Sequence, residues 1–330
     1  MKKTIVAAVL AFSIIFTLGF SLGGCASMGA ISAEEYFAIG MAYFDLGRYD
    51  EAEQWLNRAR ARDRTMSASE YNLGRIAFET GRFDEALRYF ELILRRDPTN
   101  VMALRAAAYT QIRNGEIEKA AALYDRLLAI VPESADDGYN HALVLYAMER
   151  YADAERVLAN YEFALLENND VLLLFARIQR ELGKPEAIDS FAQWLVNNND
   201  PRVRYEYAQV LESHEFYARA LDEYREALTD LPTGSVDPTG PELRFTIARL
   251  LLVADSESSE GISELRAAVE DGYDDSEAIE DLLDDDRISA TNKDEIRTII
   301  TNMTREDEPE TEDSDAPIEE TEDAQDIFTE

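Results

Sequence analysis

The sequence predicts an all-α fold, a solenoid of stacked helix-turn-helix units, from three kinds of residue that recur with one period of 34. Small residues form two series. The first is Ala52, Ala86, Ala120 and Ala154, and the second is Gly40, Gly74, Ala108 and Ala142. Glycines form a third series, Gly47, Gly81 and Gly115, and prolines form a fourth, Pro98 and Pro132. A fixed period of this length is typical of repeat architectures, in which each repeat is one pair of packed elements.

Each series lies where a pair of packed helices needs that residue type. Small residues let two helix backbones approach, and the large Leu56, Phe90 and Tyr124 then fill the space between successive units. A glycine ends the first helix because the left-handed conformation costs it little, and a proline stops the second helix. No single pair can bury its apolar face, so neighbouring pairs stack into one continuous core.

In this register the residues resemble the tetratricopeptide repeat family. The first repeat has the family's signature residues, and they are Tyr36, Ile39, Gly40, Tyr43, Gly47, Tyr49, Ala52, Leu56 and Ala59. The sixth repeat has Ala208, Tyr217, Ala220, Tyr224, Ala227 and Pro232. The resemblance implies a right-handed superhelix of six repeats over residues 33–234, at 33–66, 67–100, 101–134, 135–168, 169–200 and 201–234.

The family pattern weakens in two places within the repeats and again beyond them. Repeat five lacks one residue at the turn between its two helices, and Glu149 stands where repeat four would have its turn glycine. Residues 235–303 are expected to form a divergent seventh helix pair and short capping helices. The final segment, 304–330, is expected to be a disordered acidic tail, which either keeps the protein soluble or binds a basic partner.

The first residues differ in kind from the rest. Lys2 and Lys3 precede an apolar run that ends in glycines and the single cysteine, Cys25. This run resembles a bacterial lipoprotein signal, with residues 1–24 removed, Cys25 acylated (palmitate or a similar chain), and residues 25–32 serving as a linker. An uncleaved anchor helix is the alternative, because the apolar run is long for a signal. Both interpretations place the body on the periplasmic or cell-envelope side, without deciding between inner and outer membrane.

Composition excludes several classes of function. The chain has 67 acidic and 32 basic side chains and a net charge of -35, so nucleic acid is a poor partner. One cysteine excludes a disulfide framework. His141 and His214 have no partners at metal or triad spacing, and Asp284–Glu295 lacks the glycine of a calcium loop. We therefore expect no catalysis, no metal and no cofactor.

The resemblance implies a concave groove lined by the first helix of each repeat. The residues at its groove positions are Phe37, Met41, Phe44, Tyr71, Arg75, Phe78, Arg105, Tyr109, Arg113, Tyr139, Tyr146, Arg177, Arg180 and Tyr205. Aromatic and arginine side chains dominate binding hot spots, although aromatics at helical spacing also pack between repeats. The family's clamp for a peptide carboxylate is not reproduced, since only Asn72 matches it.

These observations predict a membrane-anchored interaction scaffold or adaptor in a bacterial envelope complex, with a protein or peptide partner bound in the groove. The arginines favour an acidic partner. The alternative is a small anionic ligand-binding or transport-accessory lipoprotein, which a deep, closed pocket would favour over an open groove.

Overall fold

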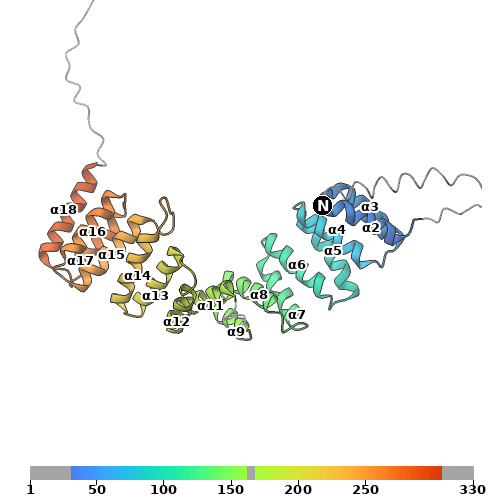
Figure 1. Cartoon of the computed structure of the whole chain (residues 1–330), viewed down its shortest axis with the longest axis horizontal. Helices are drawn as coiled ribbons and strands as arrows, with labels where there is room; N and C mark the ends of the chain where they lie inside the picture. Colours follow the sequence, from blue (N-terminus) through green and yellow to red (C-terminus); the bar gives the residue numbers. More distant parts are fainter. Residues whose placement is uncertain (1–30, 162–167, 307–330) are drawn as a thin grey trace, which may run out of the picture. The chain divides into compact units, whose positions relative to one another are not determined.

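The computed structural model describes residues 31–161 and 168–306, and within these ranges it contains sixteen helices and no strand (Figure 1). The prediction of an all-α solenoid is confirmed. The described residues divide into two compact units, one ending at Val144 and one beginning at Leu145. The signal segment, Cys25 and residues 307–330 lie outside the described residues.

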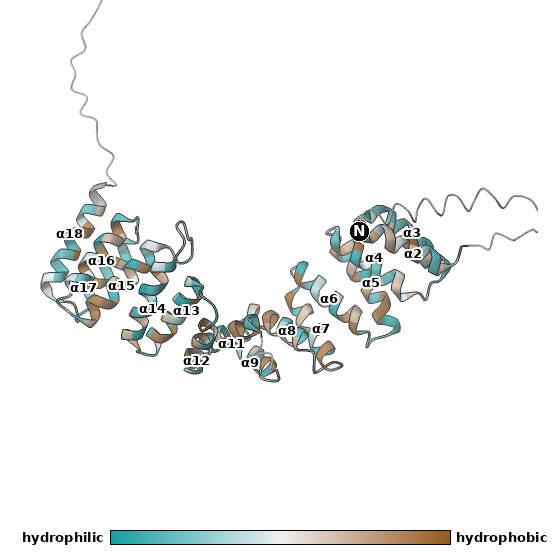
Figure 2. Ribbon diagram, in the orientation of Figure 1, coloured by the Kyte–Doolittle hydropathy of each residue, from teal (hydrophilic) through white to brown (hydrophobic). Residues whose placement is uncertain are grey.

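The first unit is a stack of helix pairs. Its helices are α2 (Ala33–Asp45), α3 (Tyr49–Arg62), α4 (Ser67–Glu79), α5 (Phe83–Arg96), α6 (Val101–Arg113), α7 (Ile117–Leu128) and most of α8 (Ala135–Ala147). The two helices of each pair, α2 with α3, α4 with α5 and α6 with α7, pack against each other, and α3 packs on α4 and α5 on α6 to join successive pairs. The pairs place the apolar side of each helix inward, and hydrophobic and hydrophilic residues accordingly alternate along the ribbons (Figure 2).

The second unit continues the same alternation and ends in a different arrangement. Its helices are α9 (Tyr151–Leu158), α11 (Asn169–Glu181), α12 (Glu186–Leu195), α13 (Pro201–Ser213), α14 (Tyr217–Asp230), α15 (Gly240–Ala254), α16 (Ser259–Glu270), α17 (Ser276–Asp284) and α18 (Ala290–Glu306). Helices α15 to α18 share one apolar cluster, which includes Leu252, Leu265, Ile279 and Ile296. Helix α18 reaches Glu306, so the boundary expected at 304 falls within its last turn.

Helices of a pair cross closely at the small residues. A Cβ atom added at Gly40 would lie 2.8 Å from Leu56 Cγ, and one added at Gly74 would lie 2.6 Å from Phe90 Cε1. On the facing helices, Ala52 and Ala86 have no exposed surface. The recurring small residues therefore mark the contact that brings each pair of backbones together.

The turn between the two helices of a repeat is left-handed whether or not a glycine is present. Gly81 has φ 75°, and Glu149 and Glu215, at the corresponding turns of later repeats, have φ 58° and 66°. A side chain pays a penalty in this conformation. The packed helices on either side thus impose the left-handed turn, and glycine lowers the conformational free energy that this turn costs.

Ala86→Leu should lower the free energy of unfolding by about 1 to 3 kcal/mol, because three extra carbon atoms must enter a crossing that has no free space. Ala61→Leu is the matched control, since Ala61 lies exposed on α3. Urea denaturation of both variants checks the prediction. Equal stability of the two variants would mean that the register of the repeats is wrong.

Candidate functional site

A hollow of about 410 Å³ in the first unit is lined mainly by α4 and α6. Five of the predicted groove residues meet in it, and they are Tyr71, Arg75, Phe78, Arg105 and Tyr109. Met102 and Tyr109 at this hollow are 56% and 49% exposed, so they present apolar surface to solvent. Beneath them, burial chiefly, with the nearby negative charge of Asp137, raises the pKa of Tyr124 to about 12, so its hydroxyl stays protonated and can donate a hydrogen bond.

Two arginines of this unit lie on aromatic rings and not on carboxylates. The guanidinium of Arg75 lies 4.5 Å from the ring centroid of Phe44 and donates to Asn72 Oδ1 at 3.2 Å. Arg113 lies 5.6 Å from the ring centroid of Phe78. Among the described residues neither forms an ion pair, not even with the nearby Glu79. Their charges therefore remain available, and the rings hold them in place.

Arg105 differs because its charge is already compensated. Its Nε and Nη2 atoms each donate to a different oxygen of Asp137, both at 2.6 Å, and Asp137 also accepts from Ser134 Oγ at 2.7 Å. Burial opposes ionisation of Asp137, but these hydrogen bonds outweigh burial and hold its pKa below the usual value. Arg105 therefore joins two helices of the stack and does not supply a free positive charge.

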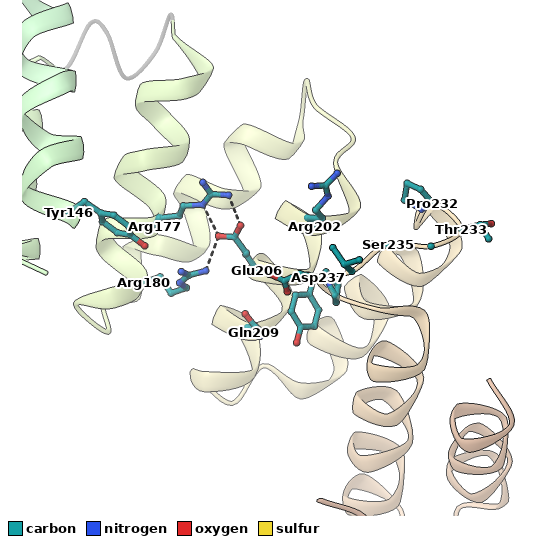
Figure 3. Close-up of a pocket in the computed structure, with 14 residues that line it drawn as sticks. Tyr146, Arg177, Arg180, Arg202, Glu206, Gln209, Pro232, Thr233, Ser235 and Asp237 are labelled. Atoms are coloured by element: carbon teal, nitrogen blue, oxygen red, sulfur yellow. Dashed lines mark hydrogen bonds and ion pairs between the residues drawn. The ribbon is translucent and has the colours of Figure 1, made fainter. Parts of the chain in front are cut away.

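A larger hollow, of about 810 Å³, lies in the second unit (Figure 3). Tyr146, Arg177, Arg180 and Tyr205 from the predicted groove line it. Figure 3 shows Arg177 and Arg180 converging on Glu206, which accepts from Arg177 at 2.6 and 2.9 Å and from Arg180 at 2.8 Å. The carboxylate that these arginines could otherwise bind in a ligand is thus supplied by Glu206 of the protein itself.

The segment between α14 and α15 forms one wall of this second hollow. Residues 232–238 line it, and Val236 among them is 87% exposed. Arg202 and Asp237 add one charge of each sign to the lining. Because Arg177 and Arg180 are paired with Glu206, the positive charge of this hollow is largely neutralised.

All fourteen predicted groove residues keep some accessible surface, and nine of them line the two hollows, five in the first unit and four in the second. Phe37, Met41 and Phe44 pack against the apolar cluster around Leu56 and Leu73. Tyr139 is half-buried and lines neither hollow. The interpretation of groove aromatics as packing residues therefore applies to part of the set.

The acidic partners of the groove arginines are not among the residues predicted from the sequence. Asp137 follows Arg105 by 32 residues, and Glu206 follows Arg177 by 29. A separation close to one repeat length places both members of a pair on neighbouring first helices, so an acidic residue at that distance was the available signal. The clamp residue Asn72 is also engaged internally, since its amide donates to the Ala68 carbonyl at 2.9 Å.

The described residues contain no group of three or more His, Cys, Asp or Glu side chains that could hold a metal ion. His141 is buried beside Tyr124, with Nε2 at 3.5 Å from Asp125 Oδ1, and His214 ends α13. Neither histidine lies in the hollows that contain the groove residues.

Comparison with known proteins agrees with this geometry. Residues 33–65 and 71–135 match two models described as tetratricopeptide repeat. Over these two ranges the chain is similar to tetratricopeptide repeats, and such repeats imply a protein–protein interaction scaffold.

One protein sequence and several solved structures are similar to part of the chain. An uncharacterized lipoprotein of Treponema pallidum (strain Nichols) is 27% identical over 159 residues, which cover 48% of this chain and 81% of that protein. A tetratricopeptide repeat protein from Parabacteroides merdae ATCC 43184 superposes with a TM-score of 0.51 and 20% identity, covering 83% of this chain and 100% of the other. MamA from Desulfovibrio magneticus RS-1 matches with a TM-score of 0.46 and 16% identity, over 50% of this chain and 96% of that one. The Parabacteroides structure supports the fold alone.

Arg105→Gln should lower the free energy of unfolding at pH 7 by about 1 to 3 kcal/mol, because it leaves a buried carboxylate without its charged donor. Since the folded pKa of Asp137 is lowered, the pair stabilises the fold above the ordinary aspartate pKa of about 3.9 and stops doing so as the pH falls through the folded value. The difference between variant and wild type should therefore shrink near pH 3. Urea denaturation at pH 7 and pH 3 measures this difference. Arg75→Gln is the control, because it breaks no ion pair. A loss of stability that stays constant with pH would contradict the stabilisation of the Asp137 carboxylate by Arg105.

Proposed function

We propose that this protein is a membrane-anchored adaptor that binds an acidic protein segment in the groove of its first unit. The family supplies the general role of a scaffold. The observation that carries the specific proposal is the pairing of exposed apolar side chains, Met102 and Tyr109, with two arginines that have no carboxylate partner among the described residues.

The chemistry of this groove favours a peptide over a small molecule. Its hollow is lined by aromatic rings, including those of Phe78 and Tyr109, and by Arg75, and Arg113 lies over the ring of Phe78. An arginine that lies on a ring is held in place and binds a carboxylate with two parallel hydrogen bonds. A segment that alternates apolar and acidic side chains would satisfy both features at once.

The alternative of a small anionic ligand is supported by the second hollow, which is larger and contains three arginines. There, however, Glu206 already accepts hydrogen bonds from two of them. An incoming anion would have to displace this carboxylate or bind beside its negative charge. We therefore place the principal site in the first unit.

The proposed anchor is the acylated Cys25. It is supported by the sequence around Cys25 and by the name of the Treponema relative. Within the described ranges no helix has the length and hydrophobicity needed to cross a membrane. Acylation would tether the protein at the end next to α2, so the first unit is the part joined to the membrane by the shortest segment.

Changing Arg75 and Arg113 together to Glu should weaken partner binding by more than about 2 kcal/mol, roughly 30-fold, because two attractive charges become repulsive. Helical content and melting should stay unchanged, since neither arginine pairs with a described carboxylate. Crosslinking in intact cells, followed by quantification of the co-purified partner, gives the readout.

The matched control for this experiment is Arg58→Glu with Arg88→Glu. These arginines are exposed on α3 and α5 and line neither hollow, so the change in net charge is the same. If the groove variant captures as much of the same partner as the control does, the site lies elsewhere on the protein.

Cys25→Ser should abolish labelling of the protein by radioactive palmitate and leave an unprocessed precursor, because acylation needs the thiol and two or more acyl chains are what give stable anchoring. Gel electrophoresis and autoradiography of the labelled membranes measure both effects. Labelling that persists in the variant would exclude Cys25 as the acylated residue.

A further inference from the structure

A third hollow, of about 450 Å³, lies in the first unit between the second helices of two repeats, α5 and α7. It shares no lining residue with the groove hollow of the same unit. The buried Leu87, Ala107 and Gln111 line its interior, and Leu94 and Leu123 add half-buried apolar walls. Pockets for small molecules measure about 300 to 1,000 Å³, so this hollow is large enough for one.

Two positions at this hollow carry smaller side chains than their counterparts one repeat earlier. Leu73 and Tyr89 hold these positions in the second repeat, where both belong to one packed apolar cluster. Ala107 and Leu123 replace them in the third repeat and line the hollow. The smaller side chains leave the space between α5 and α7 open.

An unsatisfied polar group lies in the interior. Gln111 is 9% exposed, and its Oε1 atom has no hydrogen-bond partner among the described residues. Gln179 has the same place two repeats later, and there Ser190 Oγ donates to Gln179 Oε1 at 2.7 Å. At the position equivalent to Ser190 the hollow has Leu123, which has no donor. A buried acceptor without a partner costs free energy, and a ligand that brought a donor would offset this cost.

Two arginines at the hollow have charges that no carboxylate compensates. Arg95 lies in the last turn of α5, and Arg126 donates to the Pro98 carbonyl, a neutral acceptor just beyond α5, at 3.1 Å. Among the described residues neither arginine forms an ion pair. Glu91 is the one acidic side chain in the lining, so two guanidinium groups outnumber it. This end of the hollow therefore attracts an anion.

The acceptor and the two arginines lie at opposite ends of the hollow. The Glu116 N–H donates to the Gln111 carbonyl at 2.9 Å, which places Gln111 beside the start of α7. Lys119, near this start, already pairs with Glu116 at 2.9 Å. Arg126 follows Lys119 by seven residues, roughly 10 Å along the helix. The leucines of the hollow line the space between the two ends.

We propose that this hollow binds an extended organic carboxylate that has an aliphatic body and a hydroxyl group at the end opposite its carboxylate. The carboxylate accepts hydrogen bonds from Arg95 and Arg126, the aliphatic body lies along the leucines, and the hydroxyl donates to Gln111 Oε1. A medium-chain hydroxy fatty acid has this chemistry. The inference goes beyond the proposed function, because it uses none of the groove residues.

Photoaffinity labelling of the purified full chain tests this inference. The probe is 10-hydroxydecanoate with a diazirine in the middle of its chain, and mass spectrometry identifies the labelled peptides. We expect labelling within residues 87–95, 107–111 and 119–126, which line the hollow. Unlabelled 10-hydroxydecanoate should compete at least about five-fold better than decanoate, because decanoate has no donor for Gln111.

The Gln111→Leu variant tests the role of the acceptor. The preference for 10-hydroxydecanoate over decanoate should disappear, while decanoate should compete as well as in the wild type. The fold should tolerate this change, because the buried Leu145 holds the equivalent position in the next repeat.

A pair of double variants tests the role of the charges. Arg95→Gln with Arg126→Gln should lower the labelling at least about ten-fold, because it removes both charged donors to the carboxylate. Arg58→Gln with Arg88→Gln is the matched control, since these arginines are exposed on α3 and α5 and do not line the hollow. The control should change the labelling by less than about two-fold.

The opposite outcomes would each overturn the inference. Labelling spread along the chain, or labelling that unlabelled 10-hydroxydecanoate does not reduce, would mean nonspecific binding. Labelling confined to residues 71–78 would assign the carboxylate to the groove of the first unit. A hydroxyl preference that persists in the Gln111→Leu variant would exclude this acceptor, and an equal loss in both arginine pairs would mean that overall charge alone attracts the probe.

Discussion

The close crossing of two helices at a small residue is the contact on which the rest of this structure depends. At Gly74 the backbone of α4 approaches α5 so nearly that even a methyl group would overlap Phe90. That approach buries Phe90 almost completely, and the large side chain then becomes the surface on which the next pair packs. The same contact recurs every 34 residues. The first helix of each repeat therefore has the same orientation, and its side chains outside the crossing point in the same direction.

Ion pairs between repeats are the next contribution to the structure, and they determine which arginines have no carboxylate partner. Glu70, with a side chain only 3% exposed, receives Arg60 and Arg96 from the helices on either side. Arg82 reaches Glu53 at 2.7 Å, and Lys184 reaches Glu155 at 2.7 Å. In a protein with twice as many acidic as basic side chains, most arginines in the stack find a carboxylate. Those that do not, such as Arg75 and Arg95, mark the surfaces with available positive charge.

The two hollows that contain groove residues differ for this reason, although the repeat pattern treats them alike. In the first unit, aromatic rings hold Arg75 and Arg113. In the second unit, one glutamate occupies Arg177 and Arg180 together. A free guanidinium over a ring can bind an incoming carboxylate at little cost, whereas a compensated pair must first release its own. The same residue types at equivalent positions thus leave positive charge available in one unit and neutralise it in the other.

The sequence by itself determined the helix pairs, their period, the close crossings and the turns, because each of these depends on residue size or backbone freedom at positions a few residues apart. It also named the side chains that keep a solvent-accessible face. Only the tertiary structure decided that Arg105 is bound to Asp137 while Arg113 is not, and that Gln111 lacks the hydroxyl that Gln179 receives. The physical reason is that an ion pair or a buried hydrogen bond joins residues from different helices at distances of about 3 Å, and a one-dimensional pattern does not specify which side chains meet at that range.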